Sequence, residues 1–281
     1  MSNDIVTTDW LEAHLGTPDI AILDASWHLP TAQRDAKREF TACHIPGAQF
    51  FDIDELSDTA SPLPHMLPSP EKFASRMRKM GVGDGKRVIV YDSVGLFSAA
   101  RAWWMFKVFG HEDVAVLDGG LKKWIVEGRP LEEGPARKPA ERHFTARFRP
   151  SMVRDYKDVA AALKSGAAQI ADARSASRFR GEEAEPRAGV RAGHMPGSKN
   201  VHYASLLKPD GTLKSPAEIA AAFTGAGIDM SKPVITSCGS GVTAAILTLG
   251  LTLTGARDHA LYDGSWTEWG GNPDSPIATG S

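Results

Sequence analysis

Short apolar runs bounded by turn residues alternate with helix-forming stretches along the whole chain. The apolar runs predict strands near 20–23, 88–91 and 114–117, and again near 169–171, 234–236 and 260–262. Helices are predicted over 70–79, 98–109, 216–223 and 244–253, and Gly110 and Gly255 are placed to end two of them. Strands that alternate with helices predict an α/β fold of parallel sheets, each flanked by helices on both faces.

Several motifs occur twice, in the same order and at nearly constant spacing. CHIPGA at 43–48 matches GHMPGS at 193–198, and VLDGG at 116–120 matches LYDGS at 261–265. A chain of 281 residues is long for one average domain and suits two. We therefore expect two tandem copies of one fold.

The boundaries of these two domains are predicted from the change in composition between them. Residues 134–150 are rich in proline and charge and show no apolar period. The sequence therefore predicts an N-terminal domain over 1–133, a linker over 134–150 and a C-terminal domain over 151–281.

Candidate chemistry lies in the loop CGSGVT at 238–243, between a predicted strand and a predicted helix. A strand, a glycine-rich loop and a helix together direct backbone N–H groups at one atom, here the sulfur of Cys238. Amides and a helix N-terminus favour negative charge, so they would stabilise a thiolate nucleophile. In the first half Asp92 stands where the cysteine stands, so only the second half carries the nucleophile.

Composition excludes several classes of function. A net charge of −2 gives no basic field for nucleic acid. Two cysteines form neither a disulfide framework nor a metal-binding pattern, and they suit a reducing compartment. The first residues lack the basic region and apolar core of a signal peptide, so we expect none, and no apolar run reaches membrane-spanning length. We expect a cytoplasmic protein without cofactor, metal, nucleic-acid partner or membrane partner.

With these motifs the chain resembles two-domain sulfurtransferases of the rhodanese family. The resemblance covers nearly the whole chain and includes both HxPG motifs, both DG motifs and the cysteine loop. Family members that use thiosulfate have arginine and lysine after the cysteine. The neutral loop CGSGVT, and RFRGEEAEPR at 178–187, resemble the 3-mercaptopyruvate sulfurtransferases instead.

The resemblance implies an activity and a set of residues that carry it. The sulfur of 3-mercaptopyruvate would pass through a persulfide on Cys238 to a thiol, a thioredoxin-like dithiol or cyanide, with release of pyruvate. Arg178 and Arg187 are implied to hold the substrate, and Asp54 and His65 to join Ser240 in a proton relay. The other loop residues are implied to bind the substrate: Gly239, Gly241, Val242 and Thr243.

The residues by themselves leave these roles open. Nearby arginines could replace the implied pair: Arg174, Arg180 and Arg191. Ser240 could be an ordinary turn hydroxyl, and Asp54 could cap a helix that begins near Glu55.

The charge of the loop bears on the sulfur donor. Thiosulfate is a dianion and would gain from cationic loop side chains, whereas the carboxylate of mercaptopyruvate would gain from an arginine fork. A thiosulfate sulfurtransferase with a neutral loop is the main alternative. A phosphatase of the same fold needs a longer loop that ends in arginine, and Ala244 follows Thr243 here. A non-catalytic anion-binding module fits the first half, whereas the second half retains its cysteine.

Overall fold

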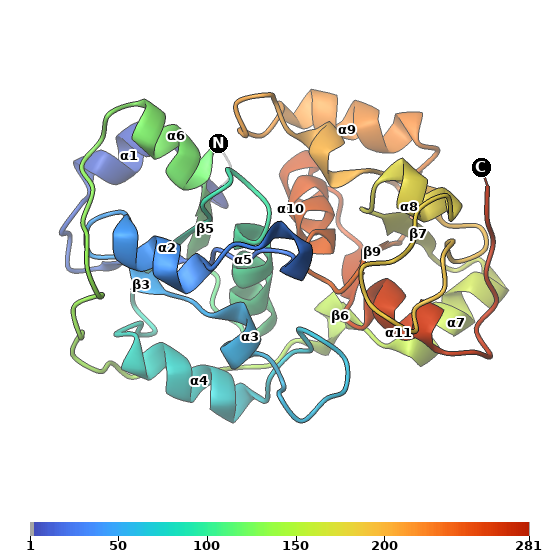
Figure 1. The fold of residues 1–281 in the computed structure, drawn as a ribbon, viewed down its shortest axis with the longest axis horizontal. Coiled ribbons are helices and arrows are strands. Elements are labelled where there is room, and N and C mark those ends of the chain that lie inside the picture. Colours follow the sequence, from blue (N-terminus) through green and yellow to red (C-terminus); the bar gives the residue numbers. More distant parts are fainter. Residues whose placement is uncertain (1–2, 281) are drawn as a thin grey trace. The chain divides into compact units, whose positions relative to one another are not determined.

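The computed structural model describes residues 3–280, and contacts divide them into two compact units. The first unit contains the described residues up to Thr59, together with Leu67–Arg149 and Lys208–Leu213. The second contains Ala60–Met66, Pro150–Leu207 and the described residues from Lys214 onward. Each unit thus includes a short segment whose neighbours in sequence belong to the other. In Figure 1 the first unit runs largely from blue to green and the second from yellow to red.

The first unit is built on a parallel sheet of five strands. Its strands are β1 (Ile5–Val6), β2 (Ile20–Asp24), β3 (Gln49–Phe50), β4 (Arg87–Tyr91) and β5 (Val114–Leu117), in the order β1-β5-β4-β2-β3. Its α-helices are α1 (Thr8–Ala13), α2 (Ala36–Ala42), α3 (Ile53–Leu56), α4 (Pro70–Lys79), α5 (Ala99–Val108) and α6 (Gly120–Val126), with a 3₁₀ turn at Pro30–Ala32. Every strand pair is parallel.

The second unit repeats this topology. Its strands are β6 (Val153–Arg154), β7 (Gln169–Asp172), β8 (Lys199–Asn200), β9 (Val234–Ser237) and β10 (His259–Tyr262), in the order β6-β10-β9-β7-β8. Its α-helices are α7 (Tyr156–Ser165), α8 (Ala176–Arg180), α9 (Pro216–Gly225), α10 (Ala244–Thr254) and α11 (Ser265–Gly271), with 3₁₀ turns at Pro150–Met152 and Tyr203–Leu206. All its strand pairs are parallel too, which confirms the predicted duplication.

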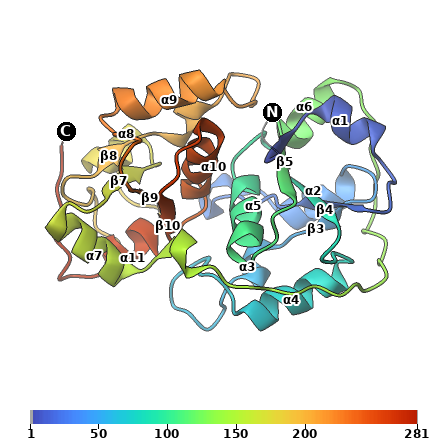
Figure 2. The same ribbon diagram turned by 180° about the vertical axis from the view of Figure 1, so that it is seen from behind.

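Both faces of the first sheet are covered because side chains alternate along each strand. Ile89 and Tyr91 of β4 pack in one core with α1, α2 and α6, to which α6 contributes Trp124. The helix α5 contacts β4 and β5 (Figure 2), and its Phe106 meets Phe73 of α4 with ring centroids 5.3 Å apart. The predicted two-faced α/β architecture is therefore confirmed.

In the second unit, α7 and α11 share a buried core with one side of the sheet. Ile235 of β9 packs there with Val159 and Trp266. The helices α9 and α10 contact each other, and α10 also contacts β9 and β10. The packing of helices against the sheet is thus repeated in the second unit, as the strand order is.

The predicted elements agree closely with those observed. The helix over 70–79 is correct at both ends, and α10 ends at Thr254, one residue later than predicted. Gly255 is its C-cap, with a left-handed φ of 81°. Ser98 is the N-cap of α5 and not its first residue. The two-residue edge strands and the shorter helices were missed because elements of so few residues are too short to show a hydrophobic period.

The predicted linker packs against the first unit. Phe144 is fully buried, and its ring lies 5.8 Å from that of Phe73. The exact boundaries at 133/134 and 150/151 remain a prediction. Among residues 3–280, no helix combines the length and apolar character that crossing a bilayer requires.

Candidate active site in the second unit

Cys238 lies directly after β9, an inner strand of the second sheet. The loop 238–243 then leads into α10, so the cysteine occupies the carboxyl end of a parallel strand, where such sheets bind ligands. Its side chain is almost wholly buried, at 2% exposure. Two regular elements therefore position the cysteine: β9 before the six-residue loop and α10 after it.

The segment after β10 holds the loop from behind. The carbonyl of Cys238 accepts a hydrogen bond from Trp266 N at 2.9 Å. The carbonyl of Gly239 accepts from Thr267 N at 2.9 Å and from Thr267 Oγ1 at 2.6 Å. Ser265, with a left-handed φ of 50°, accepts from Cys238 N through its hydroxyl at 3.2 Å. The DG motif of this segment was identified from the sequence, but no role was assigned to Ser265 or Thr267.

The carbonyls of Cys238 and Gly239 are thus bound, but several amides of the loop remain available to an acceptor. The amides of Gly239, Ser240, Val242 and Thr243 donate no hydrogen bond to any residue within 3–280. Gly241 has a left-handed φ of 77°, a conformation that glycine adopts without strain. A loop of this kind suits an anionic group on the sulfur of Cys238.

The first unit shows what such a loop does with an anion. Asp92 follows β4 as Cys238 follows β9, and its carboxylate is buried. One carboxylate oxygen accepts from the amides of Phe97, Ser98 and Ala99 at 2.7, 2.9 and 2.9 Å. The other accepts from Val94 N at 3.0 Å. A strand, a loop and a helix N-terminus therefore gather four amides around one negative group.

His65 belongs to the segment Ala60–Met66 of the second unit, and it contacts the loop directly. Its Nδ1 lies 2.9 Å from Ser240 Oγ, and both side chains are buried. His65 adopts a left-handed φ of 62°, which is uncommon outside glycine. The structure therefore brings together three of the four predicted catalytic residues: Cys238, Ser240 and His65.

Asp54, the fourth, belongs to the first unit and lies in α3. Its Oδ2 accepts from Trp27 Nε1 at 3.1 Å. The alternative interpretation of Asp54 as a helix cap is wrong, because the carboxylate of Asp52 accepts from the amides of Asp54 and Glu55. The helix begins at Ile53, two residues earlier than that interpretation assumed.

Arg178, in α8, lies over the cysteine loop. A Cβ placed on Gly239 would stand 3.1 Å from Nη2 of Arg178, which is close contact. Nη2 donates to Glu185, whereas Nε is buried and has no acceptor within the described part of the chain. Arg187 is partly buried in the irregular loop that follows α8. Arg178 is thus a cationic side chain with a spare donor next to the loop.

The other arginines that the sequence left open have structural partners. Arg174 is buried and forms an ion pair with Asp172. Arg180 pairs with Glu182, and both of these side chains are largely exposed. Arg191 donates to carbonyls at the end of α11. None of the three is placed against the loop by these contacts.

The histidines of the HxPG motifs are also structural. His44 Nδ1 bonds to the Phe40 carbonyl and His194 Nδ1 to the Phe179 carbonyl, each at 2.8 Å. Trp266 and Trp269 are fully buried. No group of three or more metal-binding side chains occurs within residues 3–280.

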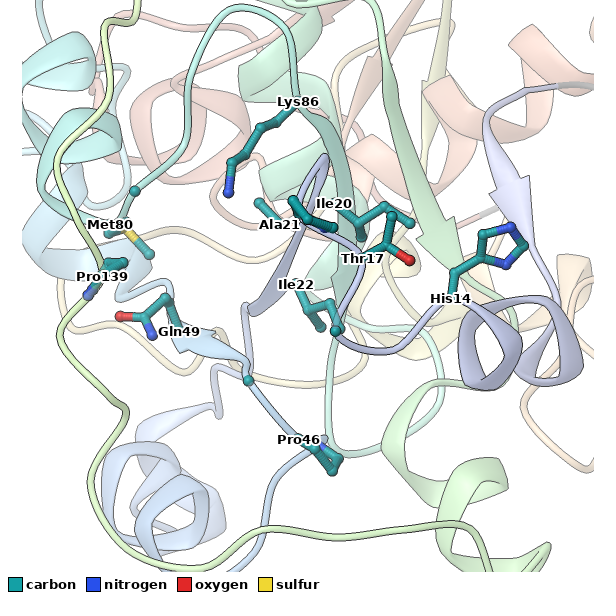
Figure 3. A pocket seen from close by; sticks show the side chains of 14 residues that line it. His14, Thr17, Ile20, Ala21, Ile22, Pro46, Gln49, Met80, Lys86 and Pro139 are labelled. Atoms are coloured by element: carbon teal, nitrogen blue, oxygen red, sulfur yellow. The ribbon is translucent and has the colours of Figure 1, made fainter.

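A cavity of about 180 Å³ lies in the first unit, at the opposite end of β2 from Asp24 (Figure 3). Gln49 and Lys86 are among its lining residues, and none of the predicted site residues reaches it. The candidate site is therefore the cysteine loop and not this cavity.

Comparison with known proteins places these features in a family. The model of the rhodanese-like domain matches residues 7–127 and 155–272. The 3-mercaptopyruvate sulfurtransferase of Escherichia coli K12 is 48% identical and is aligned over 97% of this chain and 96% of its own. The human 3-mercaptopyruvate sulfurtransferase is 45% identical, over 94% of this chain and 91% of its own.

A solved structure agrees with the sequence comparisons. The crystal structure of SseA from Escherichia coli, described as a 3-mercaptopyruvate sulfotransferase, is 47% identical to this chain. It covers 93% of this chain and 98% of its own, with a TM-score of 0.86.

Proposed function

Since this chain belongs to the rhodanese family, we propose that it is a sulfurtransferase that takes sulfur from 3-mercaptopyruvate and forms a persulfide on Cys238. The observation that carries the proposal is a buried cysteine at the carboxyl end of β9, in a neutral loop where four amides have no acceptor within residues 3–280: those of Gly239, Ser240, Val242 and Thr243. The second domain, predicted over 151–281, would be catalytic. The first, predicted over 1–133, would not, because Asp92 replaces the nucleophile.

In the first half-reaction the Cys238 thiolate attacks the sulfur of the donor thiol. A new S–S bond forms, the C–S bond breaks, and its electron pair remains on carbon as the enolate of pyruvate. The proton of the donor thiol, now on the terminal persulfide sulfur, moves to that carbon. The products are pyruvate and an anionic persulfide on Cys238, and no external oxidant is needed.

The loop amides would stabilise the anionic persulfide. Asp92 supports this, since four amides hold its carboxylate in the corresponding loop of the first unit. Such preorganised donors cost no reorganisation when charge develops.

The proton transfer is assigned to Ser240 and His65. Their 2.9 Å contact gives a hydroxyl on the cysteine loop a direct path to an imidazole. The family resemblance adds Asp54 to this relay, and we propose the same role for it here.

Arg178 and Arg187 are proposed to hold the carboxylate and carbonyl of the donor. Arg178 supports this with its position over Gly239 and with its buried Nε, which has no acceptor among the described residues. The loop residues themselves carry no charge. The arginine above them would therefore favour mercaptopyruvate, whose carboxylate it can bind, over the dianion thiosulfate.

In the second half-reaction an acceptor attacks the terminal sulfur and restores the Cys238 thiolate. Thiols, thioredoxin-like dithiols and cyanide are the proposed acceptors. A reducing compartment such as the cytoplasm suits this cycle, because a catalytic thiol must stay reduced.

Donor kinetics test the proposal. With a dithiol acceptor, kcat/KM should be far higher for 3-mercaptopyruvate than for thiosulfate, and pyruvate should form in step with sulfur transfer. A preference for thiosulfate would instead support the alternative, a thiosulfate sulfurtransferase with a neutral loop. Activity with neither donor would contradict both assignments.

A further inference from the structure

Glu185 lies in the loop after α8. In the sequence it stands between Arg178 and Arg187, the two arginines proposed to hold the donor, and its side chain is only 4% exposed. One carboxylate oxygen accepts from Arg178 Nη2. The other accepts from Arg174 Nη1 at 2.7 Å. A buried carboxylate is therefore shared between a fixed arginine and the arginine above the loop.

Arg174 is the fixed end of this arrangement. Its side chain is 1% exposed, and it donates to Asp172 at 2.7 Å and to the Gly193 carbonyl at 2.8 Å. Its guanidinium also lies 4.4 Å from the ring centroid of Trp266, a cation–π contact. Because every side of this guanidinium is held, the Glu185 oxygen bound to it is held as well.

We propose that Glu185 is a positioning residue that holds the Arg178 guanidinium above Gly239, in the orientation that receives the carboxylate of the sulfur donor. This inference rests on the proposed function of Arg178. Charges alternate along the chain of contacts, from Asp172 through Arg174 and Glu185 to Arg178. The positive and negative charges of this network therefore balance before a donor anion binds.

Two further features fit this role. An arginine side chain is flexible, and holding one of its nitrogens in advance lowers the ordering cost of binding. Glu185 occupies Nη2 and leaves Nε as a buried donor without an acceptor within residues 3–280. Gly239 contributes space, because any side chain there would meet Nη2 at about van der Waals distance or less.

The test is Glu185→Gln, which keeps the shape and removes the charge. With 3-mercaptopyruvate, KM should rise about tenfold while kcat stays within about threefold, because binding is lost in the ground and transition states alike. Glu182→Gln is the matched control: it removes the same charge from an exposed pair in the same loop and should leave KM unchanged.

A second measurement separates positioning from damage to the fold. Discharge of a preloaded persulfide to cyanide does not use the donor carboxylate, so Glu185→Gln should leave its rate unchanged. A second variant, Arg174→Lys, keeps the positive charge but loses the fork that anchors Glu185, and its KM should also rise. Equal losses in both half-reactions would show a merely structural role and overturn the proposal.

Arg178→Ala distinguishes the failure of this inference from failure of the proposed site. If Arg178→Ala leaves KM unchanged, Arg178 does not bind the donor, and the site assignment fails. If Arg178→Ala raises KM while Glu185→Gln does not, only the positioning role fails. A lower KM in Glu185→Gln would show that Glu185 competes with the donor, which also overturns the inference.

Discussion

The imidazole of His65 and the hydroxyl of Ser240 lie 2.9 Å apart, although 175 positions separate them in the sequence. His65 makes this contact with a left-handed backbone, φ 62°. Such conformations persist when the surroundings stabilise them, and they occur often at functional sites. The contact places an imidazole against the hydroxyl of the cysteine loop.

Replacing His65 by alanine should lower kcat about 100-fold and change the acidic limb of the pH–rate profile, because a positioned acid–base group is lost. KM should stay near that of the wild-type protein. Steady-state kinetics across pH measure this, with His143→Ala, an exposed histidine, as the control. If His65→Ala matched the wild-type protein at every pH, the relay would have to be abandoned.

Replacing Cys238 by serine should lower turnover about a thousandfold or more, since the persulfide can no longer form. Intact mass spectrometry without reductant should show the wild-type protein gaining one sulfur atom after exposure to the donor. Cys43→Ser should gain the same mass and keep its activity. Sulfur loading that persisted in Cys238→Ser would place the nucleophile elsewhere.

Replacing Gly239 by arginine should lower kcat/KM for 3-mercaptopyruvate and raise the relative use of thiosulfate. The new side chain must displace the Arg178 guanidinium, 3.1 Å from its Cβ, and it adds positive charge beside a dianionic donor. Gly271→Arg, at an exposed site where a Cβ meets nothing within 4 Å, controls for the added charge. An unchanged ratio of the two specificity constants would show that the loop does not select the donor.

Replacing Asp92 by alanine should destabilise the first unit by about 3 kcal/mol or more, because four amides lose their buried acceptor. The midpoint of thermal or urea unfolding measures this loss. Asp113→Ala, which removes a carboxylate that is 60% exposed, should have little effect. A midpoint unchanged by Asp92→Ala would mean that the carboxylate does not stabilise its loop.

Asp24 should make stability depend on pH. Burial raises the pKa of this carboxyl from 3.8 to about 6, with the neighbouring Asp92 adding to the effect. Its contribution to stability is therefore greatest below pH 3.8 and is lost as the pH rises to about 6. Asp24→Asn should be more stable than the wild-type protein at pH 8, by up to about 3 kcal/mol. The difference should vanish near pH 4.

Unfolding midpoints of the two proteins between pH 4 and pH 8 measure this effect. The counterpart in the second unit, Asp172, has Arg174 as an ion-pair partner, so Asp172→Asn serves as the contrast and should destabilise. A constant difference between Asp24→Asn and the wild-type protein across pH would contradict the assignment.

The sequence by itself determined the duplication, the parallel α/β architecture and the position of Cys238 at the end of a strand. These depend on local patterns: apolar runs such as 234–236, glycines such as Gly255 that end helices, and motifs that repeat. Each is readable because the cause lies within a few residues. The relation of Arg178 to the donor was suggested only by resemblance.

Tertiary structure alone decided which polar groups meet. It placed Nδ1 of His65 against Ser240 and brought the Thr267 segment behind the loop. It also assigned Arg174 to a buried ion pair and left Arg178 over Gly239. No local pattern encodes the contacts of His65, Thr267 and Arg178, because each joins residues far apart in the sequence that only the folded chain brings together.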